Sequence, residues 1–280
     1  MNSELVAQCA VLAMLFELSS NPKPGNVDRG HDFDDIGFND FLISAVSTYP
    51  VFRKAASGEG SAGSLILDGV QAWKGWNIES NTHFGSLILM IPIAIAAGRG
   101  GKLPGELADV IKKSTVGDAI DFYSAFEKAK ARVVEVESFS LNDENWEKAL
   151  RESGKTLLDL MRLSANHDIV AREWATNYER SFLLAKKLDE QIAQLGQNDG
   201  IVRTFLEALA EVPDSLICAK FGEEMARKIS VRAGEALQDE TLARAHELDE
   251  DLLAQDINPG STADLIAASL FISLLGGLRF

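Results

Sequence analysis

The sequence predicts an all-α fold, a compact bundle of about a dozen helices. Apolar residues recur at steps of three and four along almost the whole chain of 280 residues, as they do on one face of a helix. The alternation of apolar and polar residues that marks a strand is confined to VVEVESF, residues 133–139. Hydrophobic residues make up 46% of the chain, which is enough to bury a large core.

The first predicted helix covers residues 3–18. Its apolar run LVAQCAVLAMLFEL is a buried helix rather than a signal peptide, because Glu4 precedes it and no lysine or arginine occurs before Lys23. Helices at 39–56 and 61–77 follow, separated by the turn SGEGSAG. The next helix, 82–98, is the most apolar of the chain, and we expect it at the centre of the core.

The second half of the chain continues in the same way. Short turns such as GRGGKLPGE, LGQNDG and INPG separate the helices that we expect at 104–113, 116–134, 143–163, 166–194, 200–211, 215–230, 240–254 and 261–278. None of these turns is long enough to be a domain linker, so we expect one helical domain over residues 1–280. The charge-rich region at 140–200 could form a peripheral helical subdomain.

The charge of the chain limits its function. It has 42 acidic and 27 basic residues, a formal net charge of −15, so the phosphate backbone of a nucleic acid would be repelled. The apolar segments 84–98 and 263–278 are shorter than a membrane span, so we expect no membrane association. Cys9 and Cys218 have no metal-binding or disulfide spacing and are expected to be reduced core thiols in a cytoplasmic protein. The oligomeric state cannot be predicted from this sequence.

Charged residues are concentrated in the stretch NPKPGNVDRGHDFDD, residues 21–35, which follows Glu17. Loop carboxylates are hard oxygen ligands suited to Mg²⁺, which binds one or two of them together with substrate phosphates. The same acids could instead form a solvated turn that leads to a cap of the next helix at Asn39 or Asp40. The spacing is not that of a calcium loop.

A second polar cluster, SNTHFG at 80–85, precedes the most apolar helix. Asn81 or Thr82 can cap this helix, and the free N–H groups at its start attract anions. His83 would lie in the first turn, either as an incidental residue or as a catalytic one.

Two further clusters lie at helix starts. In PDSLICAKFG, 213–222, Asp214 or Ser215 caps a helix and Lys220 follows as a solvated charge. In NPGSTADL, 258–265, Ser261 and Asp264 fit a capping box. The backbone N–H groups and hydroxyls of this fourth cluster could equally cradle a phosphate.

Taken in order, these clusters resemble the signatures of the triphosphoribosyl-dephospho-CoA synthase family. The KPGLVD-type loop and D-M-D element of that family correspond to KPGNVD at 23–28 and DFD at 32–34. Its N-T-H-K-G helix start corresponds to NTHFG at 81–85, its D-T-N-L-x-H-R-G-G-like segment to DSLICAKFG at 214–222, and its S-P-G-G-S-A-D-L motif to PGSTADL at 259–265. The chain departs from the pattern at Phe84, Leu216 and Ala219, where the family has lysine, asparagine and histidine.

The resemblance implies an all-helical enzyme that joins the triphosphoribosyl part of ATP to a ribose hydroxyl of dephospho-CoA and releases adenine. The product is the precursor of the prosthetic group of an acyl carrier protein in citrate or malonate decarboxylating systems. Breaking the ribose–adenine bond creates an oxocarbenium-like centre that a carboxylate can stabilise, for which Glu17, Asp28 and Asp34 are candidates. His83 is the candidate donor to the departing adenine.

Binding of the triphosphate is expected to combine a metal with local bases. The candidate Mg²⁺ ligands are Asp28, Asp32 and Asp34. The candidate nucleotide and phosphate contacts are Lys23, Gly25, Arg29, Asn81, Thr82, Lys220, Gly260, Ser261 and Thr262.

Two alternatives remain open at this stage. The lost polar positions leave room for another ribosyl or phosphoribosyl transfer with a different acceptor, for example in making a pterin-type one-carbon cofactor. The chain could also be a non-catalytic nucleotide-binding or helical interaction protein in which the caps are only caps.

Overall fold

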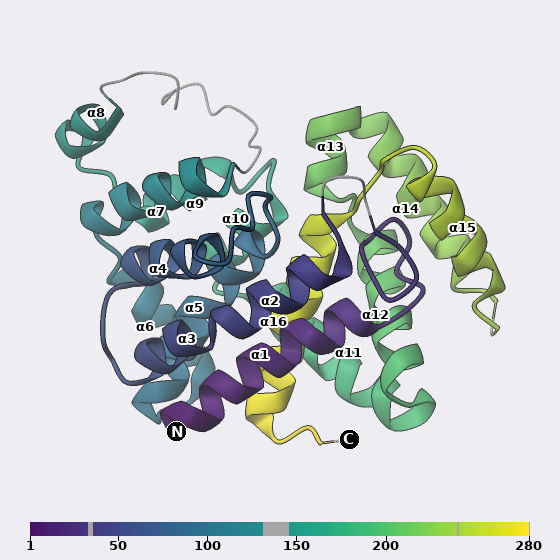
Figure 1. Cartoon of the computed structure of the whole chain (residues 1–280), viewed down its shortest axis with the longest axis horizontal. Helices are drawn as coiled ribbons and strands as arrows, with labels where there is room; N and C mark the ends of the chain where they lie inside the picture. Colours follow the sequence, from purple (N-terminus) through teal and green to yellow (C-terminus); the bar gives the residue numbers. More distant parts are fainter. Residues whose placement is uncertain (33–35, 131–145, 240, 280) are drawn as a thin grey trace. The chain divides into compact units, whose positions relative to one another are not determined.

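The computed structural model describes residues 1–32, 36–130, 146–239 and 241–279. Within these ranges the chain forms helices and no strand, which confirms the all-α prediction (Figure 1). The strand-like segment 133–139 lies outside the described residues. The helices are α1 (Ser3–Ser19), α2 (Phe38–Ser47), α3 (Tyr49–Ala56), α4 (Ala62–Lys74), α5 (Phe84–Arg99), α6 (Leu103–Lys112), α7 (Val116–Ala129), α8 (Trp146–Ser153), α9 (Leu157–Ser164), α10 (Ile169–Ala175), α11 (Glu179–Leu195), α12 (Gln197–Glu211), α13 (Ser215–Phe221), α14 (Glu223–Ala236), α15 (Ala243–Leu253) and α16 (Gly260–Gly276).

Four predicted helices are wrong as single elements, because each is a pair of helices in the structure. Pro50 lies in the first turn of α3, where no helical hydrogen bond needs its N–H. The same missing N–H prevents the preceding helix, α2, from continuing through this position. Gly154 and Gly222 have φ values of +64° and +87°, which stop α8 and α13. Tyr178 also has a positive φ, +62°, between α10 and α11. The affected predictions are 39–56, 143–163, 166–194 and 215–230.

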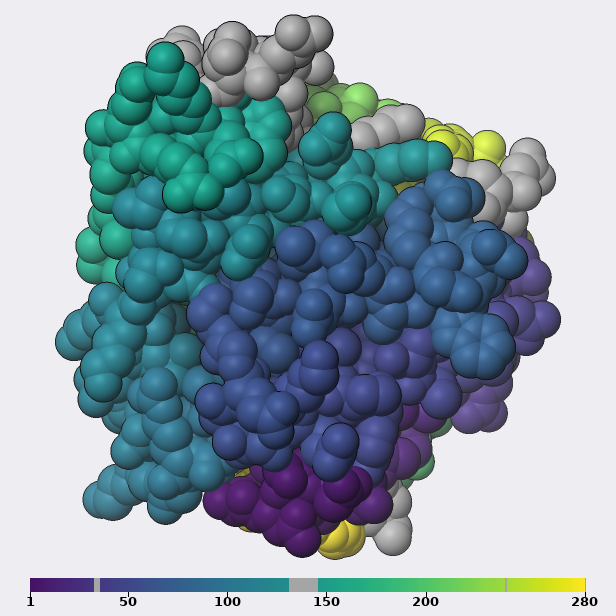
Figure 2. Space-filling view, turned by 60° about the vertical axis from the view of Figure 1, so that its left-hand side comes forward, coloured from purple at the N-terminus to yellow at the C-terminus, as the bar shows by residue number. Residues whose placement is uncertain are grey.

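The chain divides into two compact units, the first consisting of Met1–Leu12 and Leu42–Glu179. Helix α5 is the core of this unit and contacts α3, α4, α6 and α10. Figure 2 shows a face of this unit on which the blue and teal segments that contain α4 and α7 lie side by side, and these two helices are in contact.

Pro92 lies inside α5 and is tolerated there through contacts from α10 and the turn after it. Proline has no N–H, so the carbonyl of Ile88 loses its helical donor. Trp174 Nε1 donates to this Ile88 carbonyl oxygen at 3.1 Å instead, and the Tyr178 hydroxyl donates to the Leu89 carbonyl oxygen at 3.0 Å. The freed backbone acceptor is therefore satisfied by an indole from another helix.

The second unit consists of Ala13–Phe41 and Arg180–Phe280. In it α14 contacts α12, α13 and α15, while α16 contacts α12 and α13. Phe205, Leu206 and Phe271 are completely buried in this unit. The second half of α1 belongs to this unit, and the polar loop that follows α1 is therefore positioned by it. The prediction of one domain over 1–280, with or without a subdomain at 140–200, stays a prediction, because a division by contacts does not decide whether the units fold separately.

In the described ranges, no single helix is both long and apolar enough to cross a membrane. Helices α5 and α6 reach that length only as a pair, and they are bent by 118° at their junction.

Candidate functional site

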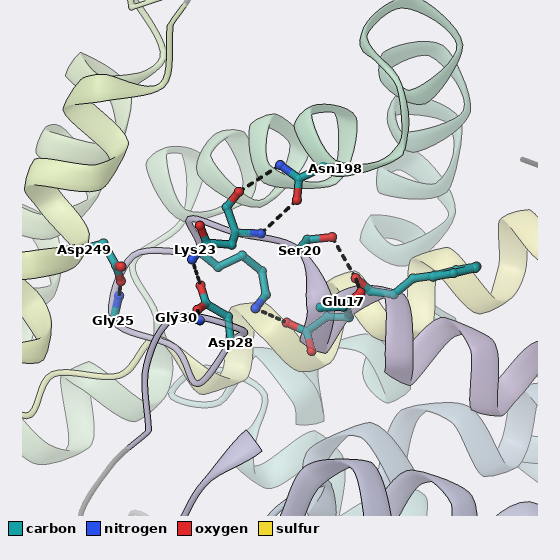
Figure 3. Close-up of polar contacts among 11 residues, drawn as sticks. Glu17, Ser20, Lys23, Gly25, Asp28, Gly30, Asn198 and Asp249 are labelled. Atoms are coloured by element: carbon teal, nitrogen blue, oxygen red, sulfur yellow. Dashed lines mark hydrogen bonds and ion pairs between the residues drawn. The ribbon is translucent and has the colours of Figure 1, made fainter. Parts of the chain in front are cut away.

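The loop after α1 is a polar segment that is buried. Residues 22–28 are all buried, although they include Lys23, Asn26 and Asp28. Buried polar groups must find partners within the protein or in a ligand. The partners of this loop, shown in Figure 3, therefore define what the site can bind.

Lys23 and Glu17 form a buried ion pair. Lys23 Nζ lies 3.4 Å from Glu17 Oε1, and the Lys23 side chain is 0% exposed. Neither of these two atoms has a hydrogen-bond partner among the described residues. Burial raises the pKa of the Glu17 carboxyl, and the neighbouring Asp28 raises it further, whereas Lys23 opposes the shift. The pair thus places a buried ammonium with unused donors beside a carboxylate that takes up a proton more readily than an exposed one.

Asp28 is fixed by its own loop. Asn21 Nδ2 donates to Asp28 Oδ2 and the Gly30 N–H donates to Asp28 Oδ1, both at 2.7 Å. The Asn21 N–H in turn donates to Asn198 Oδ1 in the first turn of α12, and Asn198 Nδ2 donates to the Asn21 carbonyl oxygen. Asn198 is labelled in Figure 3. Each Asp28 oxygen keeps a lone pair for a ligand.

Asp249 on α15 also belongs to this cluster, and the sequence analysis did not identify it. It is 1% exposed, and its Oδ1 accepts the Gly25 N–H at 2.8 Å. Its Oδ2 lies 3.4 Å from His31 Nδ1. Burial and the charge of Asp28 raise the pKa of Asp249, while the Gly25 N–H, His31 and Lys23 lower it. The available signal was its place on the buried face of α15, together with Ala245, Leu248 and Leu252.

Gly25 brings the loop against the segment that precedes α16. Its φ is +78°, and a Cβ at this position would lie 2.2 Å from the Ile257 carbonyl oxygen and 3.2 Å from Pro259 Cδ. Only glycine allows both this conformation and this approach. The first and fourth sequence clusters are therefore in contact.

Asp214 joins the third cluster to the fourth. Its Oδ1 accepts from the N–H groups of Leu216 and Ile217, which caps α13 as predicted. Its Oδ2 accepts from both the N–H and the hydroxyl of Thr262, at 2.7 and 2.8 Å. Burial raises the pKa of Asp214 to about 6 despite these hydrogen bonds.

The predicted capping box at Ser261 is wrong. Helix α16 begins one residue earlier, at Gly260, after Pro259, which makes no side-chain cap. The Thr262 N–H donates to Asp214 from another helix, and Ser215 Oγ donates to Ser261 Oγ at 3.0 Å. Because Asp214 accepts the Thr262 groups, a phosphate contact of Thr262 stays a prediction, as it does for Gly260 and Ser261.

The second cluster lies in the first unit. The Asn81 Oδ1 accepts the Phe84 N–H at 3.2 Å. Thr82 Oγ1 donates to Ser44 Oγ at 2.6 Å, and His83 Nδ1 lies 3.0 Å from the same oxygen. His83 is the N-cap residue of α5 rather than part of its first turn.

Burial lowers the pKa of His83 to about 3, so it is neutral at ordinary pH. A neutral imidazole donates one hydrogen bond but carries no extra proton. Its role as donor to adenine stays a prediction, and so do the nucleotide contacts predicted for Asn81 and Thr82.

Phe84, which stands where the family has lysine, is part of an aromatic cluster. It is buried, and its ring lies 5.8 Å from that of Phe122 and 5.7 Å from that of Phe126, measured between centroids. This position therefore supplies apolar packing and no charge.

The remaining predicted residues are not buried with Asp28. Arg29 and Asp32 are exposed, and Asp32 Oδ1 accepts the N–H of Phe38 at the start of α2. Lys220 pairs with Asp256 at 3.7 Å, and its Nζ lies 5.8 Å from the centroid of the Phe221 ring. Asp34 lies outside the described residues. Within the described ranges no three His, Cys, Asp or Glu side chains gather to hold a metal, so the predicted ligand set Asp28, Asp32 and Asp34 stays a prediction.

Comparison with known proteins confirms the family resemblance. The family model described as CitG, ATP:dephospho-CoA triphosphoribosyl transferase, matches residues 3–279. A protein of Pseudomonas fluorescens (strain Pf0-1), provisionally named 2-(5''-triphosphoribosyl)-3'-dephosphocoenzyme-A synthase, is 22% identical over 96% of this chain and 91% of its own length.

The fold is shared with a solved structure. A crystal structure of a protein from Archaeoglobus fulgidus, provisionally named triphosphoribosyl-dephospho-CoA synthase, has a TM-score of 0.72 and 27% sequence identity. The match covers 85% of this chain and 100% of that one. Since the family model spans nearly the whole sequence, the chain belongs to the ATP:dephospho-CoA triphosphoribosyl transferase family.

Proposed function

We propose that this chain transfers the triphosphoribosyl group of ATP to dephospho-CoA, and that its triphosphate site is the loop at residues 21–31, of which residues 22–28 are buried. The observation that carries this assignment is Lys23, an ammonium that is 0% exposed and has no hydrogen-bond acceptor among the described residues. A buried ammonium is stable only when it is paired, and Glu17 at 3.4 Å is a loose partner. A phosphate oxygen supplies the charged acceptor that Nζ lacks.

In this reaction the bond between C1′ of the ATP ribose and the adenine nitrogen breaks, and a ribose hydroxyl oxygen of the acceptor bonds to C1′. The hydroxyl loses its proton, and adenine leaves with a proton. Glu17 is suited to accept the hydroxyl proton, since its pKa is raised by burial. Its negative charge, together with that of Asp28, also stabilises the positive charge that develops at C1′.

Magnesium fits this site through few ligands. Mg²⁺ usually binds one or two carboxylates plus substrate phosphates and keeps several waters, so it does not need a group of three acids. Asp28 fits as a ligand, because its two oxygens are oriented by Asn21 and Gly30 and each keeps a lone pair. When bound, Mg²⁺ neutralises part of the triphosphate charge, which a chain of net charge −15 cannot do by its overall field.

The proposal also covers the use of the product. In the resembling family it is the precursor of an acyl-carrier-protein prosthetic group, and we extend that role to this chain as a proposal. The second candidate is transfer to another acceptor, such as one used for a pterin-type one-carbon cofactor. The packing of Phe84 among Phe122 and Phe126 favours it, because the cation of that family position is replaced by an apolar ring.

Mass spectrometry of the products tests the proposal. The protein incubated with ATP, Mg²⁺ and dephospho-CoA should release adenine and form a triphosphoribosylated product. The variant Lys23→Met keeps the side-chain volume and removes the charge, and it should lose this activity. Lys186→Met, a change at an exposed lysine of α11, is the matched control and should keep it. Adenine release only with a different acceptor would establish the second candidate and overturn the first.

A further inference from the structure

Asp249 accepts a hydrogen bond from Gly25 in the proposed triphosphate loop, residues 21–31, and lies close to His31 at the end of this loop. Its Oδ1 accepts the Gly25 N–H at 2.8 Å, two residues after Lys23. Its Oδ2 lies 3.4 Å from His31 Nδ1, three residues after Asp28. Gly25 and His31 lie on either side of Asp28 along the loop, and the hydrogen bond from Gly25 to Asp249 is drawn in Figure 3.

The position of Asp249 in α15 makes it a rigid support. Ala245, Leu248 and Leu252 are buried on the same helix, and Asp249 is 1% exposed among them. A buried carboxylate is expensive unless it accepts hydrogen bonds, so its place on this apolar face requires a compensating role. Accepting a backbone N–H that no helix or strand would otherwise satisfy is such a role.

The contact cannot be replaced by packing alone. Gly25 lies against the Ile257 carbonyl oxygen with its φ at +78°, and in this conformation its N–H donates to Asp249 Oδ1. Without the acceptor, the N–H would be buried and unpaired, and the loop would leave this conformation to reach water. Lys23 and Asp28 would move with it.

We infer that Asp249 is a positioning residue of the transfer reaction, which holds the Lys23–His31 loop in the conformation that binds the triphosphate of Mg-ATP. The inference rests on the proposed function, because it assigns Asp249 to the same site. It predicts that Asp249 acts through its hydrogen bond to Gly25 and not by touching the nucleotide.

Three variants separate these roles. Asp249→Asn keeps an oxygen that accepts the Gly25 N–H, whereas Asp249→Leu fills the apolar face and removes the acceptor. Asp251→Asn is the matched control on the same helix, since Asp251 is exposed and pairs with Arg232. Isothermal calorimetry measures the affinity for Mg-ATP and needs no acceptor substrate, so it reports on nucleotide binding by the loop separately from the transfer reaction.

We expect Asp249→Leu to weaken Mg-ATP binding by about tenfold or more, because a hydrogen bond to a charged group is lost at the site. Asp249→Asn and Asp251→Asn should stay within about threefold of the wild type. In steady-state kinetics Asp249→Leu should raise the KM for ATP and leave the KM for dephospho-CoA unchanged. Hydrogen exchange at the Gly25 amide should be slow in the wild type and in Asp249→Asn, and fast in Asp249→Leu.

Several results would overturn the inference. Unchanged Mg-ATP affinity in Asp249→Leu would remove the positioning role. An equal loss in Asp249→Asn would show that the charge itself contacts the ligand. An equal rise of both KM values with a lower Tm would show a structural role only. If Asp249→Leu does not fold, Asp249→Asn still decides, because it keeps the acceptor for the Gly25 N–H and removes the charge, so a large loss of Mg-ATP affinity in this variant contradicts the inference.

The proposed function fails separately. A wild type that binds Mg-ATP but releases no adenine with dephospho-CoA would refute the transfer reaction and leave the positioning of the nucleotide intact. A wild type that does not bind Mg-ATP would overturn both.

Discussion

Asp214 accepts two hydrogen bonds from Thr262, one from the backbone N–H and one from the hydroxyl, across a sequence separation of 48 residues. The other oxygen of the same carboxylate caps α13. One buried carboxylate therefore caps the N-terminus of α13 and also accepts hydrogen bonds from the first turn of α16. It holds together the two sequence motifs at the starts of these helices.

The first prediction concerns the pH dependence contributed by Asp214. Its pKa is raised to about 6 in the folded protein, above the ordinary 3.8, so the folded state binds the proton more tightly. The tighter proton binding of Asp214 stabilises the folded protein fully below pH 3.8, and this stabilisation is lost as the pH rises to about 6. Its size is roughly 3 kcal/mol of unfolding free energy. The difference in unfolding free energy between the wild type and Asp214→Asn, measured by urea titration between pH 4 and 7, should show this slope. A pH-independent difference would contradict it.

The control for this measurement is the same titration of a variant at His83. Burial lowers the pKa of His83 to about 3, so its contribution is present above pH 6.5 and falls as the pH falls. As the pH falls, Asp214 raises the free energy of unfolding and His83 lowers it, and the pH ranges of the two effects overlap. The contribution of each group is therefore obtained from the difference between the wild type and the variant at that residue.

The second prediction concerns the buried pair of Glu17 and Lys23. Glu17→Gln leaves the Lys23 ammonium buried without a counter-charge, which should lower the free energy of unfolding by about 3–5 kcal/mol. Lys23→Met should cost less, because the pKa of Glu17 is already raised and its carboxyl can take up a proton. The double variant should recover most of the loss. Urea denaturation of the four proteins gives the coupling free energy, and strict additivity would show that the pair does not interact.

The third prediction compares two glycines with the same backbone conformation. Gly25 and Gly58 both have a φ of +78°, but a Cβ at Gly58 meets no atom within 4 Å, whereas at Gly25 it would lie 2.2 Å from the Ile257 carbonyl oxygen. Gly58→Ala should cost only the backbone strain, about 1–2 kcal/mol. Gly25→Ala should cost a further 1–3 kcal/mol, roughly, and weaken Mg-ATP binding. Equal unfolding free energies and unchanged nucleotide affinity for the two variants would refute the close packing of the loop.

The fourth prediction concerns the proline in α5. Trp174→Phe removes the indole donor to the Ile88 carbonyl oxygen and should lower the unfolding free energy by about 1–3 kcal/mol. Pro92→Ala restores the backbone N–H that this carbonyl lacks. In the Pro92→Ala background, Trp174→Phe should therefore cost clearly less, as measured by thermal unfolding monitored by circular dichroism. An equal cost in both backgrounds would mean that the indole acts by packing alone.

The fold class and the polar clusters were predictable because their signals are local. Helical periodicity predicted the all-α fold, and the order of short motifs predicted which loops carry the polar groups. The helix breaks were not predictable, because single residues such as Pro50 and Gly222 occur inside otherwise helical patterns, and tertiary packing decides whether the helix continues. The capping box at Ser261 failed because α16 begins at Gly260, so Pro259, which has no side-chain acceptor, precedes the helix in place of Ser261.

Asp249 was missed because it belongs to no motif. An acid in the pattern ARAHELDEDLL is indistinguishable by composition from the solvated acids beside it. Its burial is visible only when its helical phase is compared with Leu248 and Leu252, and its partner Gly25 lies 224 residues away in the sequence. Contacts at such separations follow from the packing of the unit and not from spacing along the chain.

The loop that follows α1 has an interior and an exterior stretch, and the two should tolerate change very differently. Residues 22–28 are enclosed, and at Gly25 any added carbon meets a main-chain oxygen, whereas residues 29–32 lie in water. A saturation library over this loop should therefore return functional clones with more diverse residues after position 28 than before it, so that survival counts alone separate the enclosed part of the nucleotide site from its exposed part.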